Sequence, residues 1–147
     1  MLTLRGIPQL YYGDELGMWA NKQAGDGVLR QNFPAEALSA EGRDEAQTAY
    51  HAYTRRLLRW RRQCPAVQRG RLTHFAVNQG CYVYSRSLDG KRVTIVMNGT
   101  SEAVLLDMKR YAEVLPLRQA RDVLTDRIVT LGTELELEPR QSYVLEF

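Results

Sequence analysis

The sequence lacks the features that define several classes of protein. No apolar run in its 147 residues approaches the roughly 20 residues of a membrane-spanning helix, so no membrane partner is expected. The amino terminus also lacks the basic segment, apolar stretch and small-residue cleavage site of a secretory signal. Internal repeats and low-complexity segments are absent. The length fits one ordinary domain, or one small domain that carries a fragment of another.

Cysteine and histidine are scarce, with two residues of each. Cys64 and Cys81 do not have the spacing of a metal site, and two cysteines cannot build a disulfide framework, so we expect both to be reduced, buried or half-buried thiols. His51 and His74 are isolated in sequence, and we expect partly buried histidines with satisfied hydrogen bonds rather than ligands or bases. The sequence therefore predicts no metal site and no cofactor.

Charge of neither sign dominates, because the formal net charge is +3. The positive excess is concentrated in one segment, at Arg55, Arg56, Arg59, Arg61 and Arg62. On a helix, Arg55, Arg56, Arg59 and Arg62 fall mostly off the apolar face and form a solvated face, with some of them bonded to neighbouring loops. An interface with nucleic acid is the alternative, but no aromatic platform or nucleic-acid-binding motif accompanies the arginines. We therefore expect no nucleic-acid partner.

The segment from Asp44 to Cys64 has the pattern of an amphipathic helix of about five turns. Asp44 and Gln47 have the spacing of a capping box, and Pro65 supplies a stop signal. Apolar residues recur at intervals of four and three and form one stripe: Ala46, Tyr50, Tyr53, Leu57, Trp60 and Cys64.

After Pro65 the apolar pattern changes to the period of two that is typical of strands. Asp89-Gly90 is a hairpin signal and Asn98-Gly99 is a second turn signal. Many short strands at this spacing indicate an antiparallel β-sandwich or barrel. The predicted strands are Leu72 to Val77, Cys81 to Ser87, Arg92 to Asn98, Ala103 to Leu106, Gln119 to Leu124, Arg127 to Leu131, Glu134 to Leu137 and Ser142 to Phe147.

Strict alternation near the carboxy terminus predicts which side chains share a face. Leu135 and Leu137 lie on one face of their strand, and Tyr143, Leu145 and Phe147 lie on one face of the last strand.

The first residues have a different pattern. Ile7 to Tyr12 is nearly continuously apolar, which predicts a parallel strand covered on both faces. Such a strand needs a neighbour on each side. In isolation, we expect the strand and the loop after it to be disordered, to lie against the sandwich in a non-native way, or to pair with another copy. From Gly13 to Arg43 scattered glycines and polar residues predict a long irregular loop, and long loops of this kind are commonly functional.

The segment Arg5-Gly-Ile-Pro-Gln-Leu-Tyr-Tyr-Gly-Asp-Glu-Leu-Gly-Met18 closely resembles the last barrel strand of the α-amylase family, glycoside hydrolase family 13. The following order also resembles that family: a loop, a helix that ends in Leu58 to Ala66, and a sandwich that contains Val83-Tyr84-Ser85-Arg86 and Ile95-Val96-Met97-Asn98. The resemblance implies a mainly β chain. The last strand, loop and helix of a truncated (β/α)8 barrel would occupy residues 1–65, and the C-terminal antiparallel β-sandwich, amylase domain C, would occupy residues 66–147.

Gly25-Asp26-Gly27-Val28-Leu29-Arg30, followed by Phe33-Pro34, resembles a loop of the cyclomaltodextrinase and neopullulanase branch. The resemblance implies that Asp26 and Arg30 contact sugar hydroxyls on the non-reducing side of the scissile bond. From the residues alone, an ordinary ion pair within the loop is the alternative.

No catalytic residue is predicted in this chain. A retaining glycosidase needs two carboxyl groups about 5 to 5.5 Å apart, usually on different elements. In the family they come from strands upstream of Arg5, so we expect the chain alone to be inactive. Asp14 and Glu15 follow a strand end, but we expect them to anchor the loop by bonding backbone amides. Trp19 is a candidate for stacking on a sugar, and loop packing is its alternative.

Three hypotheses follow. In the first, the chain is a fragment of an α-glucan-hydrolysing enzyme whose partners are maltooligosaccharides, cyclodextrins or other α-glucans, and its unpaired barrel-strand edges allow self-association. In the second, it is a stand-alone carbohydrate-binding β-sandwich with Tyr82, Tyr84 and Phe75 as candidate aromatic contacts. In the third, the arginine-rich helix binds nucleic acid.

Overall fold

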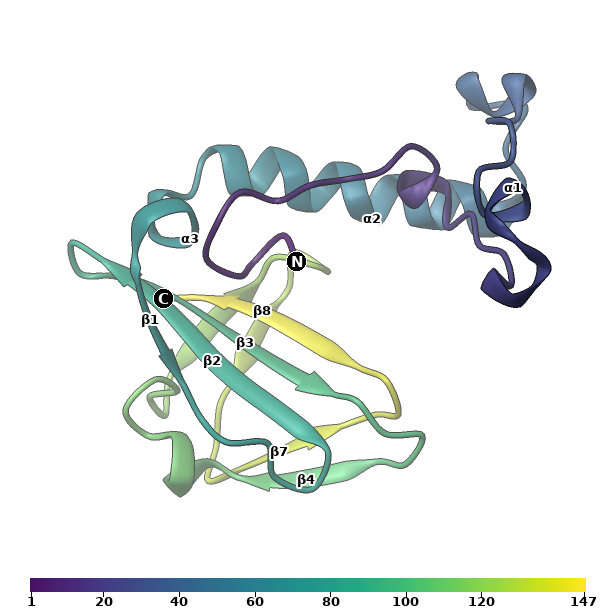
Figure 1. Cartoon of the computed structure of the whole chain (residues 1–147). Coiled ribbons are helices and arrows are strands. Elements are labelled where there is room, and N and C mark those ends of the chain that lie inside the picture. The colour runs from purple at the N-terminus through teal and green to yellow at the C-terminus, as the bar shows by residue number, and fades with distance from the viewer. The chain divides into compact units, whose positions relative to one another are not determined.

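The computed structural model describes all 147 residues, which form two compact units (Figure 1). The sheet unit comprises Met1–Gly6 and Trp60–Phe147, and the loop unit comprises Ile7–Arg59. Helix α2 (Glu45–Arg62) contributes residues to both units. No helix is long and apolar enough to cross a membrane.

The sheet unit contains all eight strands, and each overlaps one of the eight predicted segments. A six-stranded antiparallel sheet has the order β1-β2-β3-β8-β5-β6, and β4 pairs with β7 in a second antiparallel sheet. The prediction of a mainly β, antiparallel carboxy-terminal region is therefore confirmed. The strands are β1 (Arg71–His74), β2 (Cys81–Leu88), β3 (Lys91–Asn98), β4 (Val104–Asp107), β5 (Gln119–Asp122), β6 (Ile128–Thr130), β7 (Glu134–Leu137) and β8 (Ser142–Glu146).

The predicted Asp89-Gly90 turn joins β2 to β3. Leu88 pairs with Lys91 across the hairpin, and both turn residues have positive φ, 49° at Asp89 and 77° at Gly90. Two positive φ values are the geometry of a type I′ turn, which matches the twist of the flanking strands. Asn98 also closes a turn as predicted, because its side-chain oxygen accepts from the Thr100 amide at 2.9 Å.

One hydrophobic core lies between the two sheets. Val83 and Val96 enter it from the larger sheet, and Leu135 and Leu137 enter it from β7. Leu145 is buried in this core, and Tyr143 and Phe147 pack against it. The predicted alternation of β7 and β8 is therefore confirmed. A 3-10 helix that the sequence did not indicate, η4 (Met108–Tyr111), also contributes to the core.

The opposite face of the larger sheet is covered as well. Helix α3 (Pro65–Arg69) packs on β2 and β3 and buries Ala66 and Val67. Pro65 therefore both follows the end of α2 and occupies the first turn of a new helix, a position that needs no backbone N–H. Tyr84 on this face is 1% exposed, and its hydroxyl and Thr3 Oγ1 are 2.5 Å apart.

Arg61 fixes the amino-terminal segment Met1–Gly6 to the sheet unit. Its guanidinium is buried and donates to the carbonyl oxygens of Leu2 at 2.7 Å and Gly6 at 2.9 Å. A guanidinium has five N–H donors in a fixed plane, so one side chain can satisfy several carbonyls of an irregular segment.

The predicted capping box begins helix α2. The Gln47 amide donates to Asp44 Oδ1 at 2.8 Å, and Gln47 Oε1 accepts from the Asp44 amide at 3.1 Å. The predicted apolar stripe is buried only in its carboxy-terminal part, at Leu57, Trp60 and Cys64. Ala46, Tyr50 and Tyr53 are exposed, although the pattern placed them on the same face.

The buried strand predicted at Ile7 to Tyr12 is not formed. These residues lie outside every strand, and the Ile7 side chain is 97% exposed. An isolated parallel strand has no ladder partner for its backbone groups, so a favourable apolar pattern alone does not produce one. Self-association through the edges of this segment stays a prediction.

The loop from Gly13 to Arg43 is largely irregular, as predicted, but contains four short helical turns. Gly17, which ends the first of them, has φ +68°, and the ring of Tyr50 packs against its backbone. The turns are η1 (Asp14–Leu16), η2 (Lys22–Ala24), α1 (Asp26–Leu29) and η3 (Ala35–Leu38).

Candidate functional site

Asp26 and Arg30 lie at the two ends of helix α1, a single turn in the loop unit. Gly25 precedes the turn with φ +101°, a conformation that glycine adopts without strain. Arg30 Nη2 lies 3.6 Å from Asp26 Oδ2, and about 70% of each side chain is exposed. The pair is therefore preformed and faces solvent, with free acceptor and donor atoms on the two side chains.

The chemistry of this pair suits vicinal hydroxyls. A carboxylate accepts two hydrogen bonds, and a guanidinium donates in a fixed fork, so each group can orient the other. An exposed ion pair of this kind adds little stability by itself.

Two aromatic residues flank this segment in the loop unit. The Tyr12 hydroxyl donates to the carbonyl oxygen of Gln31 at 3.0 Å, directly after Arg30. Gln31 Nε2 in turn donates to the Trp19 carbonyl oxygen at 3.4 Å. A side-chain hydrogen bond with Tyr11 is the main cause that raises the pKa of Tyr12. Trp19 itself is 84% exposed, so the loop-packing alternative for its ring is not what the structure adopts.

Asp14 and Glu15 anchor the chain as predicted. Asp14 Oδ2 accepts from the Tyr11 amide and Glu15 Oε2 accepts from the Gly13 amide, both at 2.9 Å. Both carboxylates therefore bond backbone groups of the turn that contains them.

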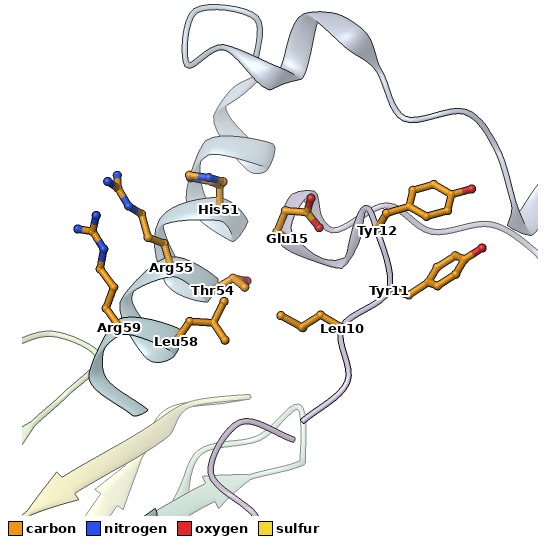
Figure 2. Close-up of a pocket in the computed structure, with 9 residues that line it drawn as sticks. All are labelled: Leu10, Tyr11, Tyr12, Glu15, His51, Thr54, Arg55, Leu58 and Arg59. Atoms are coloured by element: carbon orange, nitrogen blue, oxygen red, sulfur yellow. The ribbon is translucent and has the colours of Figure 1, made fainter. Parts of the chain in front are cut away.

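A groove of about 540 Å³ separates the Leu10 to Glu15 segment from helix α2 (Figure 2). Leu10 and Leu58 point toward one another across it, whereas the rings of Tyr11 and Tyr12 point away from the helix. Half-buried His51 lies on the helical wall. The groove is mainly apolar and open, so it resembles an interior surface without its packing partners.

Three expectations about single residues are corrected. His74 is exposed, with its ring 6.3 Å from that of Tyr82, rather than partly buried. Tyr84 is buried and Phe75 packs against the core beside Tyr111, so neither ring offers a solvent-facing platform for sugar. Only Tyr82, half-buried, remains of the three aromatic contacts suggested for a stand-alone binding module.

The burial of two arginines of the sheet unit was not predicted from the sequence. Arg61 is 8% exposed, although it lies in the arginine-rich segment of the helix. Arg86 on β2 is 2% exposed and shares a face of the strand with Tyr84, two residues earlier.

The family described as the cyclo-malto-dextrinase C-terminal domain matches residues 72–146, about half of the chain. This chain belongs to that family. The domain is a carboxy-terminal domain of the α-amylase family, glycoside hydrolase family 13, as the front segment and element order indicated.

Curated relatives extend the similarity beyond the matched domain. The chain is 32% identical over 123 residues to a cyclomaltodextrin glucanotransferase of Paenibacillus macerans. The alignment covers 84% of this chain and 16% of that protein. It is 29% identical over 150 residues to a trehalose synthase of Thermus thermophilus, covering 80% of this chain and 16% of that protein. The chain therefore spans about one sixth of the length of these two relatives.

Solved α-amylases share the fold. An Anoxybacillus α-amylase superposes with a TM-score of 0.76 at 20% identity, covering 99% of this chain and 30% of that one. A Geobacillus thermoleovorans α-amylase, solved in complex with acarbose, superposes with a TM-score of 0.75 at 24% identity, covering 99% of this chain and 30% of the other.

Proposed function

We propose that this chain is the carboxy-terminal part of an enzyme that hydrolyses α-1,4-glucosidic bonds of α-glucans with retention. Maltooligosaccharides and cyclodextrins are the proposed substrates of that whole enzyme. The catalytic carboxylates belong to barrel strands outside residues 1–147, so the chain alone is inactive.

The uneven burial of apolar side chains carries this proposal. Eleven of the seventeen exposed large apolar side chains lie in the loop unit, although it holds only 53 of the 147 residues. Only three apolar side chains of the loop unit are buried: Leu16, Ala37 and Leu57. A segment of this composition leaves so much apolar surface in water only when its packing partners lie elsewhere.

The sheet unit, by contrast, buries most of its large apolar side chains. This burial favours a structural role for the unit. Its two sheets enclose a closed core, and its second face is covered by its own residues. A self-contained domain of this kind can fold first and hold the end of the barrel in place. The proposed role of the sheet unit is therefore structural.

Within the loop unit, Asp26 and Arg30 are the proposed sugar contacts. Their 3.6 Å separation and high exposure leave both groups available to a hydroxyl pair. The exposed ring of Trp19 and the hydroxyl of Tyr12 belong to the same hydrogen-bonded loop, and aromatic faces suit the apolar faces of pyranoses.

The reading frame that precedes residue 1 in the genome tests the proposal. We expect an in-frame barrel sequence that supplies the two catalytic carboxylates on separate strands. A stop codon with no barrel sequence before it would contradict the proposal.

Variants of the longer protein test the sugar contacts. Because each lost hydrogen bond to a charged group weakens the transition state, we expect Asp26→Ala and Arg30→Ala each to lower kcat/KM for maltooligosaccharides about 10- to 100-fold. Glu36→Ala, which removes an exposed carboxylate from the same loop, is the matched control and should leave kcat/KM unchanged. Equal effects of all three variants would show that Asp26 and Arg30 form an ordinary surface ion pair.

A further inference from the structure

Arg86 is a buried cation, and two of its donor atoms have no hydrogen-bond partner. It lies on the covered face of β2, opposite Leu72 of β1 and Val93 of β3, and it is 2% exposed. Its Nε and Nη1 atoms are buried and make no hydrogen bond. Buried N–H donors are almost always paired, so this arrangement points to an acceptor from outside residues 1–147.

The charge of Arg86 cannot be relieved by deprotonation. Burial, followed by the nearby charge of Arg61, lowers the pKa of Arg86, but an arginine stays protonated in proteins. Buried lysines or carboxyl groups escape this penalty by becoming neutral, and a guanidinium does not. The buried charge of Arg86 can therefore be stabilised only by a nearby anionic group.

No counter-charge is supplied by the chain. The ionisable groups that act on Arg86 are Arg61, Tyr84 and Arg5, and none of them is a carboxylate. The three ion pairs of the structure involve other residues, at Arg30 and Arg121. Arg61, also buried, uses its donors on the carbonyls of Met1–Gly6, which leaves its charge uncompensated as well.

We propose that Arg86 is an anion-binding site for a carboxylate group, with Arg61 and Arg5 adding to its positive potential. A carboxylate matches an edge of the guanidinium with two parallel hydrogen bonds and supplies the missing charge. It can come from a small free carboxylate, or from an acidic side chain of polypeptide outside residues 1–147. The second source rests on the proposed function, and the first does not.

Thermal unfolding of the full chain tests the site, with sodium acetate compared against sodium chloride at constant ionic strength. We expect acetate at saturation to raise the Tm of the wild type by about 3 °C or more, because a ligand of the folded state stabilises it. Arg86→Met should not respond to acetate. In chloride, Arg86→Met should melt about 3 °C above the wild type, because an apolar side chain replaces an unpaired buried charge.

Arg62→Met is the matched control, since Arg62 is an exposed arginine of α2, and it should respond to acetate as the wild type does. If Arg86→Met does not fold, Arg86→Gln replaces it in the same comparison. A wild-type Tm that is equal in both salts, or an acetate response that survives in the Arg86 variant, overturns the proposal.

A second arm separates the two sources. In the longer protein that contains residues 1–147, the acetate response vanishes if an acidic side chain fills the site and persists if a free carboxylate does. If no longer reading frame exists, only the proposed function fails, because the response of the chain itself still decides whether Arg86 binds an anion.

Discussion

Single polar side chains tie the sheet unit together at its edges. Trp60 is 9% exposed, and its Nε1 donates to Glu146 Oε1 at 2.5 Å. The other carboxylate oxygen of Glu146 pairs with Arg121, which also bonds Asp126. One glutamate therefore links the end of α2 to two strands of the larger sheet.

Removing this indole donor tests its contribution. We expect Trp60→Phe to lower the free energy of unfolding by about 1 to 2 kcal/mol, because Glu146 loses a partly buried donor. Trp19→Phe is the control: its side chain is 84% exposed, so its effect should stay within about 0.5 kcal/mol. Denaturant unfolding measures both, and equal effects of the two variants would contradict this role of Trp60.

The pKa values of the two cysteine thiols predict how the free energy of unfolding depends on pH. Burial raises the pKa of both the Cys64 and Cys81 thiols above the ordinary value of 9.0. Above that pH the unfolded thiols lose protons that the folded thiols keep, so the folded state binds more protons and stability falls as pH rises. Their contribution is fully present below pH 9.0 and is lost as pH rises through the raised folded pKa values.

A variant with Cys64→Ala and Cys81→Ala measures this contribution. We expect its free energy of unfolding to fall less steeply than that of the wild type between pH 8 and pH 11, since tyrosines and lysines titrate equally in both proteins. Parallel curves for the two proteins would show that neither thiol pKa differs between the folded and unfolded states.

Helix α2 depends on its cap because its first turns leave the apolar stripe exposed. Tyr50 and Tyr53 are each about half exposed, at 53% and 50%, so packing contributes little to the amino-terminal half of the helix. The reciprocal bonds between Asp44 and Gln47 therefore matter more here than at the end of a well-packed helix.

We expect Asp44→Ala to destabilise the start of α2 by about 1 kcal/mol and to lower the helical signal in far-ultraviolet circular dichroism. Glu45→Ala, one position further on, removes a charge but no cap hydrogen bond, and should change stability by at most about 0.5 kcal/mol. An equal loss of helical signal in both variants would rule out the capping box as the cause.

The eight strands and helix α2 could be predicted because local signals decide them. Alternation fixes the buried faces of β7 and β8, and Asp89-Gly90 fixes a hairpin within a few residues. Ile7 to Tyr12 forms no strand because its pairing depends on non-local neighbours. Its apolar run describes a position inside a sheet, and no neighbouring strand exists in this chain to pair with it.

In the candidate site and around it, local contacts could also be predicted from the sequence, whereas long-range contacts could not. Asp14 and Glu15 bond amides within three residues, so their anchoring could be predicted from the sequence. The burial of Arg61 and Arg86 depends on Met1–Gly6 and α3 covering the sheet, which are contacts between segments far apart in the chain. No local pattern reports such contacts, so the burial of these two arginines could not be predicted from the sequence.

The two units of the chain differ in how far they bury their apolar side chains. The sheet unit closes its own core, whereas the loop unit exposes most of its large apolar side chains. The chain also covers about 30% of the α-amylases with which it superposes. These observations support a chain whose loop unit is completed by other polypeptide.

The release of reducing sugar from maltooligosaccharides by the purified chain is the most direct test of the central claim. Because the proposed function places the two catalytic carboxylates outside residues 1–147, we predict no release above the uncatalysed rate, and full activity in the longer protein under the same conditions. Turnover by the chain alone, retained through repeated purification, would contradict the account.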